Sequence, residues 1–280
     1  MSVAAAVRAA IQGEAGSFSH AAARVLLGAQ VEPLCCETFD GLFSALADGR
    51  VERAVLPIEN SLHGSIHENY DRLAQSGAHV VGEAQLRIEH CLVGRPGSSL
   101  QTIRRVASHA VALSQCRRFF AEHPEVEAQA AYDTAGAVRD LLRGGLVSQA
   151  AIASRLAAEL YGGQVLLEGL EDDPANFTRF LLLAREASLP EGADKTTLVF
   201  TLRSRPGALH EALGVFARRG VDLSKIESRP LRGRPWQYAF YLDVLGDPRG
   251  ASGEAVQELR GLAEELRVLG SYVDGLRAAP

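Results

Sequence analysis

Short apolar runs alternate with amphipathic stretches over the first 185 residues of the chain. A brief apolar run bounded by turn residues predicts a buried strand, and apolar positions three or four apart predict a helix. Strands are expected at residues 3–11, 54–58, 106–107, 126–130, 150–153 and 180–184. Helices are expected from Ser19, from Thr38 or Asp40, from Ser108, from Asp133 or Thr134, and up to Tyr161. This alternation favours a mostly parallel sheet with helices on both faces.

The pattern changes after a polar stretch with proline and glycine, which we interpret as a linker over residues 188–195. Beyond it, strands are predicted at 196–202, 221–230, 236–245 and 268–273, helices at 207–219 and 254–267, and a turn at 232–235. The order β-α-β-β-α-β is the ferredoxin-like plan. We therefore expect two domains, residues 1–187 and residues 196–275.

Composition and charge exclude several classes of protein. A net charge of −5 gives no basic surface for nucleic acid. The longest apolar run falls well short of the roughly 20 residues needed to span a bilayer, and the first residues lack the pattern of a secretion signal. The four cysteines and eight histidines show no disulfide framework and no metal-ligand spacing. We expect a reduced, cytoplasmic protein without a metal.

Polar residues gather where predicted strands meet loops. In Asn176-Phe177-Thr178-Arg179-Phe180, an amide, a hydroxyl and a guanidinium come together where a loop enters a buried strand. Glu59-Asn60-Ser61 follows the strand predicted at 54–58. Asn60 can donate and accept while staying neutral, which suits a ligand contact. Glu59 is either a general acid or base or a structural acceptor, and Arg179 is either a carboxylate partner or half of an ion pair.

Further candidates lie at or near three predicted helix starts. The turn Gly13-Glu14-Ala15-Gly16-Ser17 has no lysine and no dinucleotide fingerprint, but it places Ser17 at a helix start that can hold a carboxylate. Ser108 and His109 open another helix, with Gln115 two turns in, and Thr134 opens a third. His109 is either a proton shuttle or a capping residue.

These candidates all fall at strand ends, and in open α/β sheets such ends line one crevice. Their side chains are hydroxyls and amides, without a metal cluster or a nucleophile–base pair. Such a crevice suits an anionic organic acid better than it suits peptide or phosphoester hydrolysis. No cofactor is expected.

Taken together, four motifs resemble the prephenate dehydratase family. They are Gly13-x-x-Gly16-Ser17-Phe18-Ser19, Pro57-Ile58-Glu59-Asn60-Ser61 with Gly64-Ser65-Ile66, Ser108-His109 with Gln115-Cys116, and Asn176-Phe177-Thr178-Arg179-Phe180. They occur in that family's order and at its spacing. The second domain resembles the ACT domain that accompanies this family. The resemblance covers about residues 3 to 275 and implies the monofunctional form, without a chorismate mutase or dehydrogenase segment.

The resemblance implies a periplasmic-binding-protein-like catalytic domain of two α/β subdomains around a cleft, with crossovers near 80–89 and 165–180. It implies the decarboxylating dehydration of prephenate to phenylpyruvate, a lyase reaction of L-phenylalanine biosynthesis that needs no redox cofactor. Thr178 would assist the leaving hydroxyl as proton donor. The residues that would bind and position substrate are Asn60, Ser61, Ser108, Gln115, Thr134, Ser17, Asn176 and Arg179.

The ACT-like domain implies L-phenylalanine as effector and a homodimer or homotetramer as the assembly. The residues that would bind the effector are Gly207, Ala208, Leu209, His210, Glu227, Ser228, Arg229 and Pro230. His210 departs from the small aliphatic residue of relatives, which leaves the identity of the effector open. Ala110 stands where the family usually has proline after Ser-His.

Two alternatives stand beside this interpretation. Arogenate dehydratases share the fold and the motifs, and their substrate differs from prephenate only in carrying an amino group in place of the side-chain ketone. A non-enzymatic regulator that binds a small molecule could also use such a cleft. The presence of both Thr178 and Asn60 favours an enzyme, because a binding protein needs no proton donor at a leaving group.

Overall fold

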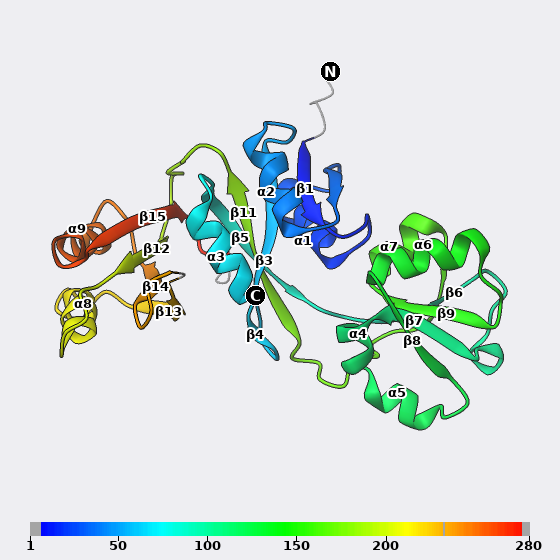
Figure 1. Ribbon diagram of the computed structural model, residues 1–280. Coiled ribbons are helices and arrows are strands. Elements are labelled where there is room, and N and C mark those ends of the chain that lie inside the picture. The colour runs from blue at the N-terminus through cyan, green and yellow to red at the C-terminus, as the bar shows by residue number, and fades with distance from the viewer. Residues whose placement is uncertain (1–6, 232, 276–280) are drawn as a thin grey trace, which may run out of the picture. The chain divides into compact units, whose positions relative to one another are not determined.

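The computed structural model describes residues 7–231 and 233–275. The chain, most of whose helices and strands are labelled in Figure 1, divides into two compact units. One contains the residues up to Ile66 together with Gln85–Phe180, and the other contains His67–Ala84 and the residues from Leu181 onward. The strands β5 (His79–Arg87) and β11 (Phe177–Ala184) each run from one unit into the other.

The first sheet has the strand order β2-β1-β3-β11-β5, and the short strand β4 pairs with β3. Strand β1 pairs in parallel with both of its neighbours, β2 and β3. The elements of this part not yet given are β1 (Arg8–Gln12), α1 (Phe18–Leu27), β2 (Glu32–Cys36), α2 (Phe39–Ala47), β3 (Arg53–Asn60), β4 (Gly64–Ser65) and α3 (His67–Gln75). The side chains of Ser17 and Thr38 cap α1 and α2 by accepting backbone N–H groups.

The second sheet has the order β10-β6-β9-β7-β8, with β7 parallel to both of its neighbours. The chain enters it between β5 and β6 and returns to the first sheet between β10 and β11. Its elements are β6 (Cys91–Gly94), η1 (Leu100–Thr102), β7 (Arg105–His109), α4 (Ala110–Ser114), α5 (Arg117–Glu122), β8 (Glu127–Ala131), α6 (Thr134–Gly144), β9 (Gln149–Ala153), α7 (Arg155–Tyr161) and β10 (Gln164–Leu167).

The strand β9 shows why this sheet needs helices on both faces. Side chains alternate across a strand, and every residue of Ala150–Ala153 is buried. Ala151 and Ala153 belong to one apolar cluster, which includes residues of α6 and α7, whereas Ala150 and Ile152 belong to another, which includes Phe119 of α5. Apolar runs of this kind are what the sequence pattern predicted for strands buried on both sides.

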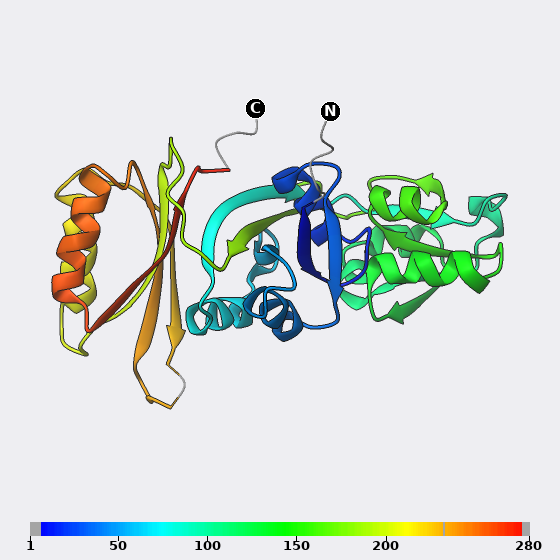
Figure 2. The same cartoon turned by 90° about the horizontal axis from the view of Figure 1, so that it is seen from above.

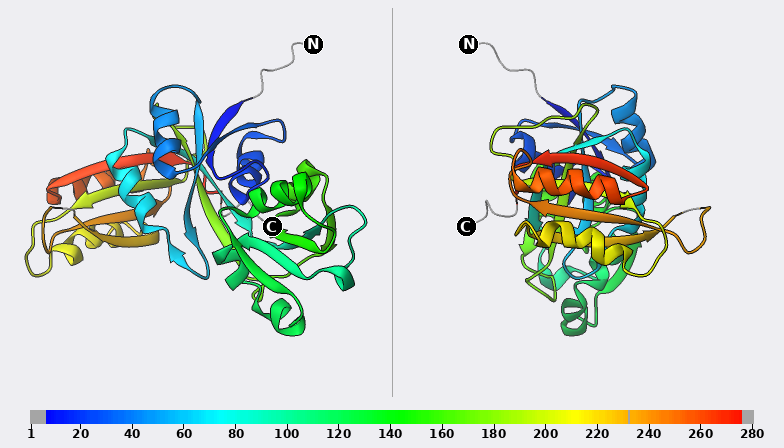
Figure 3. Two further views of the ribbon diagram at one scale, coloured as in Figure 1. Left: turned by 45° about the vertical axis from the view of Figure 1, so that its right-hand side comes forward. Right: turned by 90° about the vertical axis from the view of Figure 1, so that its left-hand side faces the viewer.

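A third, antiparallel sheet has the order β13-β14-β12-β15. Figures 2 and 3 show α8 and α9 side by side on one face of it, where Phe200, Phe216 and Leu259 are among the residues of the apolar core. Its elements are β12 (Lys195–Thr201), α8 (Ala208–Ala217), β13 (Leu223–Pro230), β14 (Tyr238–Leu245), α9 (Ala251–Leu262) and β15 (Glu265–Tyr272). The predicted fold class, mostly parallel α/β sheets followed by a βαββαβ domain, is confirmed.

Several predicted boundaries are wrong. The helix predicted at 254–267 ends at Leu262, and Glu265–Arg267 already belong to β15, because antiparallel pairing with β12 outweighs the helical periodicity of the segment. The helix predicted from Ser108 begins at Ala110, since Ser108 is still within β7. The predicted first strand begins at Arg8, and residues 3–6 and Arg232 of the predicted turn lie outside the described residues. No helix among those residues is both long and apolar enough to cross a membrane.

Candidate active site

The ends of β3 and β11 are joined by side-chain and backbone hydrogen bonds. The backbone N–H of Ser61 donates to the carbonyl of Phe177 at 2.8 Å. The Ser61 hydroxyl donates to the carbonyl of Ala175 at 2.7 Å and accepts from the N–H of Phe177 at 2.9 Å. These bonds fix the start of β11 against the end of β3 and bring Thr178 beside Asn60, although the two are 118 positions apart.

The side-chain amide of Asn60 is fixed at both of its ends. Its Nδ2 lies 3.0 Å from Thr178 Oγ1, 2.8 Å from Asn176 Oδ1 and 3.0 Å from the Phe177 carbonyl oxygen, so two N–H bonds serve three acceptors. Its Oδ1 accepts the backbone N–H groups of Leu62 and His63, each at 3.0 Å. Because backbone N–H groups can only donate, they identify the oxygen and aim Nδ2 at Thr178.

This arrangement determines what Thr178 can do. Its oxygen accepts a hydrogen bond from Asn60, so its own proton must point elsewhere. Thr178 is buried, it lines a cavity, and no other hydrogen-bond partner for its hydroxyl lies within the described parts of the chain. The hydroxyl proton is therefore free to be donated to a ligand in that cavity.

The cavity has a volume of about 410 Å³, within the range of small-molecule sites. Its described lining includes no Lys, Arg, Asp or Glu. The residues that line it are Phe18, Ser19, Pro57, Asn60, His63, Gly64, Ser65, Ile66, Ile88, His90, His109, Val111, Ala112, Gln115, Thr134, Thr178 and Phe180. Phe18 and Ser19 open α1 and Thr134 opens α6, so two helix N-termini border it, and their N–H groups and dipoles favour anions.

Gln115 connects two histidines of this cavity. Its Oε1 lies 2.8 Å from His90 Nε2, and its Nε2 lies 3.4 Å from His63 Nδ1. His90 is buried, and that burial lowers its pKa below the ordinary value, against the opposing effects of the Gln115 hydrogen bond and of the Glu171 charge. The ring of His90 is therefore neutral at neutral pH.

The other predicted substrate residues have different surroundings. The Ser108 hydroxyl is fully buried and donates to the Ile152 carbonyl at 2.6 Å, and Ser17 uses its oxygen to cap α1. Neither is part of the cavity lining. Asn176 and Arg179 are also buried and outside the lining, and Asn176 contributes through Asn60. Thr134, Gln115 and Asn60 do line the cavity.

Several lining residues were absent from the predicted site, among them His63, His90 and Ser19. His63 lies three residues after Asn60, and Ser19 lies two after Ser17. Proximity to a predicted motif was the available signal for both. His90 precedes a buried strand without any neighbouring motif, and nothing in the sequence pattern separates it from a core histidine.

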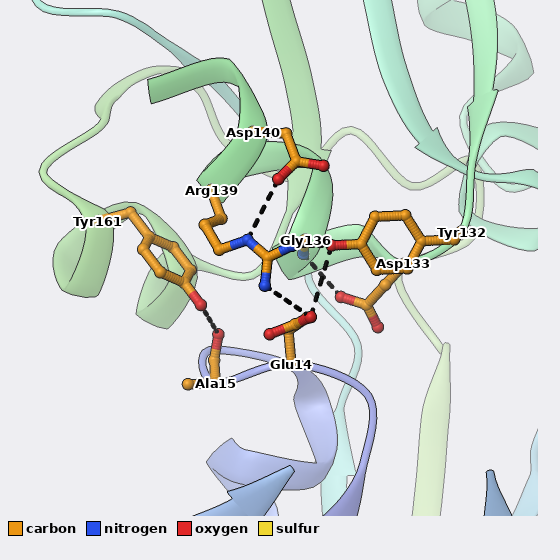
Figure 4. A network of polar contacts seen from close by, with 8 residues as sticks. All are labelled: Glu14, Ala15, Tyr132, Asp133, Gly136, Arg139, Asp140 and Tyr161. Carbon is orange, nitrogen blue, oxygen red and sulfur yellow. Dashed lines mark hydrogen bonds and ion pairs between the residues drawn. The ribbon is translucent and has the colours of Figure 1, made fainter. Parts of the chain in front are cut away.

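The turn between β1 and α1 contacts the second sheet's helices (Figure 4). Glu14 Oε1 lies 2.7 Å from a guanidinium nitrogen of Arg139 in α6, and the Tyr132 hydroxyl accepts from Arg139 at 2.6 Å. The Tyr161 hydroxyl donates to the Ala15 carbonyl at 2.9 Å. Gly16 has a φ of 90°, and a Cβ there would lie 2.8 Å from the Cα of Ala157. Glycine is thus required for this close approach.

The residues predicted to bind an effector lie in the unit that contains the third sheet. Gly207, with a φ of 79°, precedes α8, and Ala208, Leu209 and the exposed His210 form its first turn. Glu227, Ser228, Arg229 and Pro230 end the strand β13. Glu227 Oε1 lies 3.3 Å from His67 Nε2, and Arg229 pairs with Asp71, so both contact α3.

Both parts of the chain match models of known protein families. Residues 9–188 match the family model "Prephenate dehydratase", and residues 196–260 match "ACT domain". The chain is 43% identical over 279 residues to Arogenate dehydratase/prephenate dehydratase 2, chloroplastic, of Arabidopsis thaliana, covering 95% of this chain and 72% of the relative.

Solved structures resemble nearly the whole chain. A prephenate dehydratase from Arthrobacter aurescens in complex with L-Phe has a TM-score of 0.87 and 35% identity, covering 98% of this chain and 92% of the other. GqqA, described as a novel type of quorum quenching acylase, has a TM-score of 0.86 and 38% identity, covering 96% and 99%. With both family models matched in order along one chain, the protein belongs to the prephenate dehydratase family and carries an ACT domain.

Proposed function

We propose that this protein converts prephenate into phenylpyruvate, carbon dioxide and water in L-phenylalanine biosynthesis, with Thr178 as the proton donor to the leaving hydroxyl. The observation that carries the proposal is the hydrogen bond from Asn60 Nδ2 to Thr178 Oγ1 at 3.0 Å. It makes the threonine oxygen an acceptor and leaves its O–H as a donor toward the cavity.

The reaction breaks two bonds of the substrate ring. The electron pair of the carbon–carboxylate bond enters the ring as carbon dioxide leaves, and the C–O bond on the opposite carbon gives its pair to the departing hydroxide. The departing hydroxide needs one proton to become water, and solvent supplies this proton, directly or by restoring the one that Thr178 gives up. A threonine hydroxyl is a very weak acid, so its contribution is a hydrogen bond that strengthens as the C–O bond breaks. General acid assistance of this kind contributes roughly 10²–10⁴-fold.

The uncharged, largely apolar lining of the cavity favours the departure of the substrate carboxylate as carbon dioxide. Its described lining contains no charged Lys, Arg, Asp or Glu side chain, and much of it is apolar. A carboxylate that loses its hydration in such a site is destabilised relative to carbon dioxide, which is neutral. Gln115, Thr134 and the N-terminal N–H groups of α1 and α6 would hold the remaining anionic and polar groups.

Arogenate is the second candidate substrate, because the Arabidopsis relative is named for both dehydratase activities. Purified protein assayed with each substrate, for phenylpyruvate and for phenylalanine, measures the preference. Thr178→Ala should lower kcat by 10²-fold or more, roughly the range of general acid catalysis, with little change in KM. Thr178→Ser keeps a hydroxyl and should retain most of the rate. Wild-type turnover by Thr178→Ala would remove Thr178 from this role.

An acylase reaction, the activity for which GqqA is named, needs an activated nucleophile. The hydroxyl of Thr178 is bonded to a neutral amide, which cannot take its proton. Burial raises the pKa of the Cys91 thiol to about 11 and that of Cys116 to about 12, so neither is a ready thiolate. An amide-hydrolysis assay beside the dehydratase assay tests this directly.

We also propose that L-phenylalanine binds the ACT domain at Gly207–His210 and Glu227–Pro230 and regulates the enzyme. The L-Phe complex of the Arthrobacter aurescens relative supports this effector. The positive φ of Gly207 at the start of α8 supports a turn that presents backbone N–H groups to a carboxylate. We expect a homodimer or homotetramer in the cytoplasm, with residues 1–187 as the catalytic domain and 196–275 as the regulatory one.

A further inference from the structure

His63 lies in the turn between β3 and β4 and lines the cavity beside Asn60 and Gln115. Its ring Nδ1 lies 3.2 Å from Asn60 Oδ1 and 3.4 Å from Gln115 Nε2. One of these neighbours is an acceptor and the other is a donor, so together they can determine which ring nitrogen carries the proton.

The Asn60 oxygen is already satisfied. It accepts two backbone N–H groups, those of Leu62 and His63, at 3.0 Å each, and a carbonyl oxygen has two lone pairs. A third donor there gains little. The Gln115 Nε2, in contrast, has protons to give, and Nδ1 of His63 lies within its reach. With Nδ1 of His63 accepting from Gln115 Nε2, the ring carries a proton on Nε2.

His90 holds Gln115 in the orientation that this requires. Its Nε2 lies 2.8 Å from Gln115 Oε1, and its Nδ1 is buried without a partner among the described residues. If Nε2 carries the proton, the buried unpaired atom is only an acceptor, whereas the opposite tautomer would leave a buried N–H unpaired. Unpaired buried N–H groups are the rarer case in proteins. His90 thus donates to Oε1, and Gln115 presents its Nε2 to His63.

We propose that His63 donates its Nε2–H to the side-chain ketone oxygen of prephenate and makes the cavity prefer this keto acid to arogenate. This inference rests on the proposed dehydratase function. A ketone oxygen accepts such a bond, but the ammonium group of arogenate has only donors to offer. The described lining includes no Asp or Glu that could accept from an ammonium group instead.

The test is the ratio of kcat/KM for prephenate to kcat/KM for arogenate. His63→Leu should lower kcat/KM for prephenate by about tenfold, the value of one hydrogen bond, and change that for arogenate by less than about twofold. His63→Gln, which retains a donor, should recover part of the ratio. His63 is exposed on its turn, so these variants should keep the wild-type unfolding transition.

His90→Leu tests the positioning step, since Gln115 can then rotate. It should move the substrate ratio in the same direction as His63→Leu. His109→Leu is the matched control, because His109 lines the same cavity at the start of α4 but has no contact with Gln115 among the hydrogen bonds of the described residues. His109→Leu should change kcat/KM for prephenate and for arogenate by the same factor.

If His63→Leu leaves the ratio of kcat/KM for the two substrates unchanged, the inference about His63 is wrong, while the proposed dehydratase function still holds. A wild-type protein that converts neither substrate would overturn the proposed function itself.

Discussion

Arg229 of β13 and Asp71 of α3 form a two-point ion pair, with the guanidinium Nε 3.1 Å and Nη2 3.0 Å from the two carboxylate oxygens. Both side chains are largely buried. Glu227, two residues earlier on the same face of β13, lies 3.3 Å from His67, one helical turn before Asp71. The strand that carries the proposed effector motif thus holds α3 at two points, and α3 follows directly on Gly64–Ile66 of the cavity lining.

We therefore predict that Asp71→Asn weakens the response to L-phenylalanine while it spares catalysis without effector. Allosteric coupling is typically worth 1–3 kcal/mol, so we expect the effector concentration for half-maximal response to shift by about fivefold or more. The measurement is a titration of dehydratase rate with L-phenylalanine. Glu68→Gln is the control, because Glu68 lies on the same helix, makes the same change in charge and pairs with Arg72 within α3. An identical titration curve for Asp71→Asn and wild type would contradict the prediction.

Lys195, at the start of β12, is fully buried between two carboxylates. Its Nζ lies 2.8 Å from Glu83 Oε1 and 3.4 Å from Asp274 Oδ1, and Glu83 is as inaccessible as the lysine. Removing one member of a buried charge group takes a charged partner away from the others, which costs about 3–5 kcal/mol. We predict a loss of this size in the free energy of unfolding for Lys195→Met, measured by urea denaturation.

The double variant Lys195→Met with Glu83→Gln should recover part of this loss, since it buries one charge fewer. Arg203→Met is the control, because the pair of Arg203 with Glu264 is exposed and such pairs contribute about 1 kcal/mol or less. Equal small losses in Lys195→Met and Arg203→Met would show that the buried group adds nothing.

His20 should make the protein sensitive to acid. Its Nδ1 accepts the backbone N–H of Gly16 at 3.0 Å, which only an unprotonated nitrogen can do. Burial, and secondarily the charge of Arg24, lower its pKa below 6.5, against a hydrogen bond to the Val31 backbone. The unfolded chain then binds the proton more readily than the folded one. The stability that the neutral ring contributes is present above the unfolded-state pKa and is lost as the pH falls through the folded-state value.

The measurement compares urea midpoints at about pH 7.5 and about pH 5.5, on either side of the ordinary histidine pKa. Wild type should lose stability at the lower pH. His20→Asn keeps an acceptor for Gly16 but cannot be protonated in this range, so its loss should be smaller. If both proteins lose the same amount, His20 is not the group responsible.

The sequence predicted those features of the fold and the site that depend on neighbouring residues, and it failed for those that depend on contacts between distant segments. The strand 150–153 was predicted, and the caps Thr38 and Asp133 were each one of two predicted candidates, because caps and apolar runs are local patterns. Helix 254–267 failed at its end because the pairing of β15 with β12 is a contact between distant segments. The same limit applies to the candidate site. Asn60 and Thr178 were identified by motif. That the Asn60 amide hydrogen-bonds with Thr178, Leu62 and His63 could be learned only from the structure. The hydrogen bond of the Ser108 hydroxyl to the Ile152 carbonyl could not be predicted either, because the two residues are 44 positions apart in the sequence.

The ion pair of Glu14 with Arg139 should favour the arrangement in which the cavity is complete (Figure 4). Glu14 belongs to the turn before α1, whose first residues line the cavity, and Arg139 belongs to α6, whose Thr134 lines it as well. Glu14→Gln removes the charge that binds the two segments. Substrate binding would then have to stabilise the complete cavity without the ion pair. A partly exposed ion pair contributes up to about 1 kcal/mol, so KM should rise by up to about fivefold, with little change in kcat.

High salt should raise the wild-type KM toward that of the variant, since it screens the pair. Arg155→Met is the matched control, because Arg155 of α7 pairs with Glu168 and both belong to the segments around the second sheet. It removes an ion pair without separating the two segments and should leave KM unchanged. A KM for Glu14→Gln equal to that of wild type at low salt would show that the turn stays in place without the charge, held by the Tyr161 and Ser154 hydrogen bonds to Ala15 and Gly16.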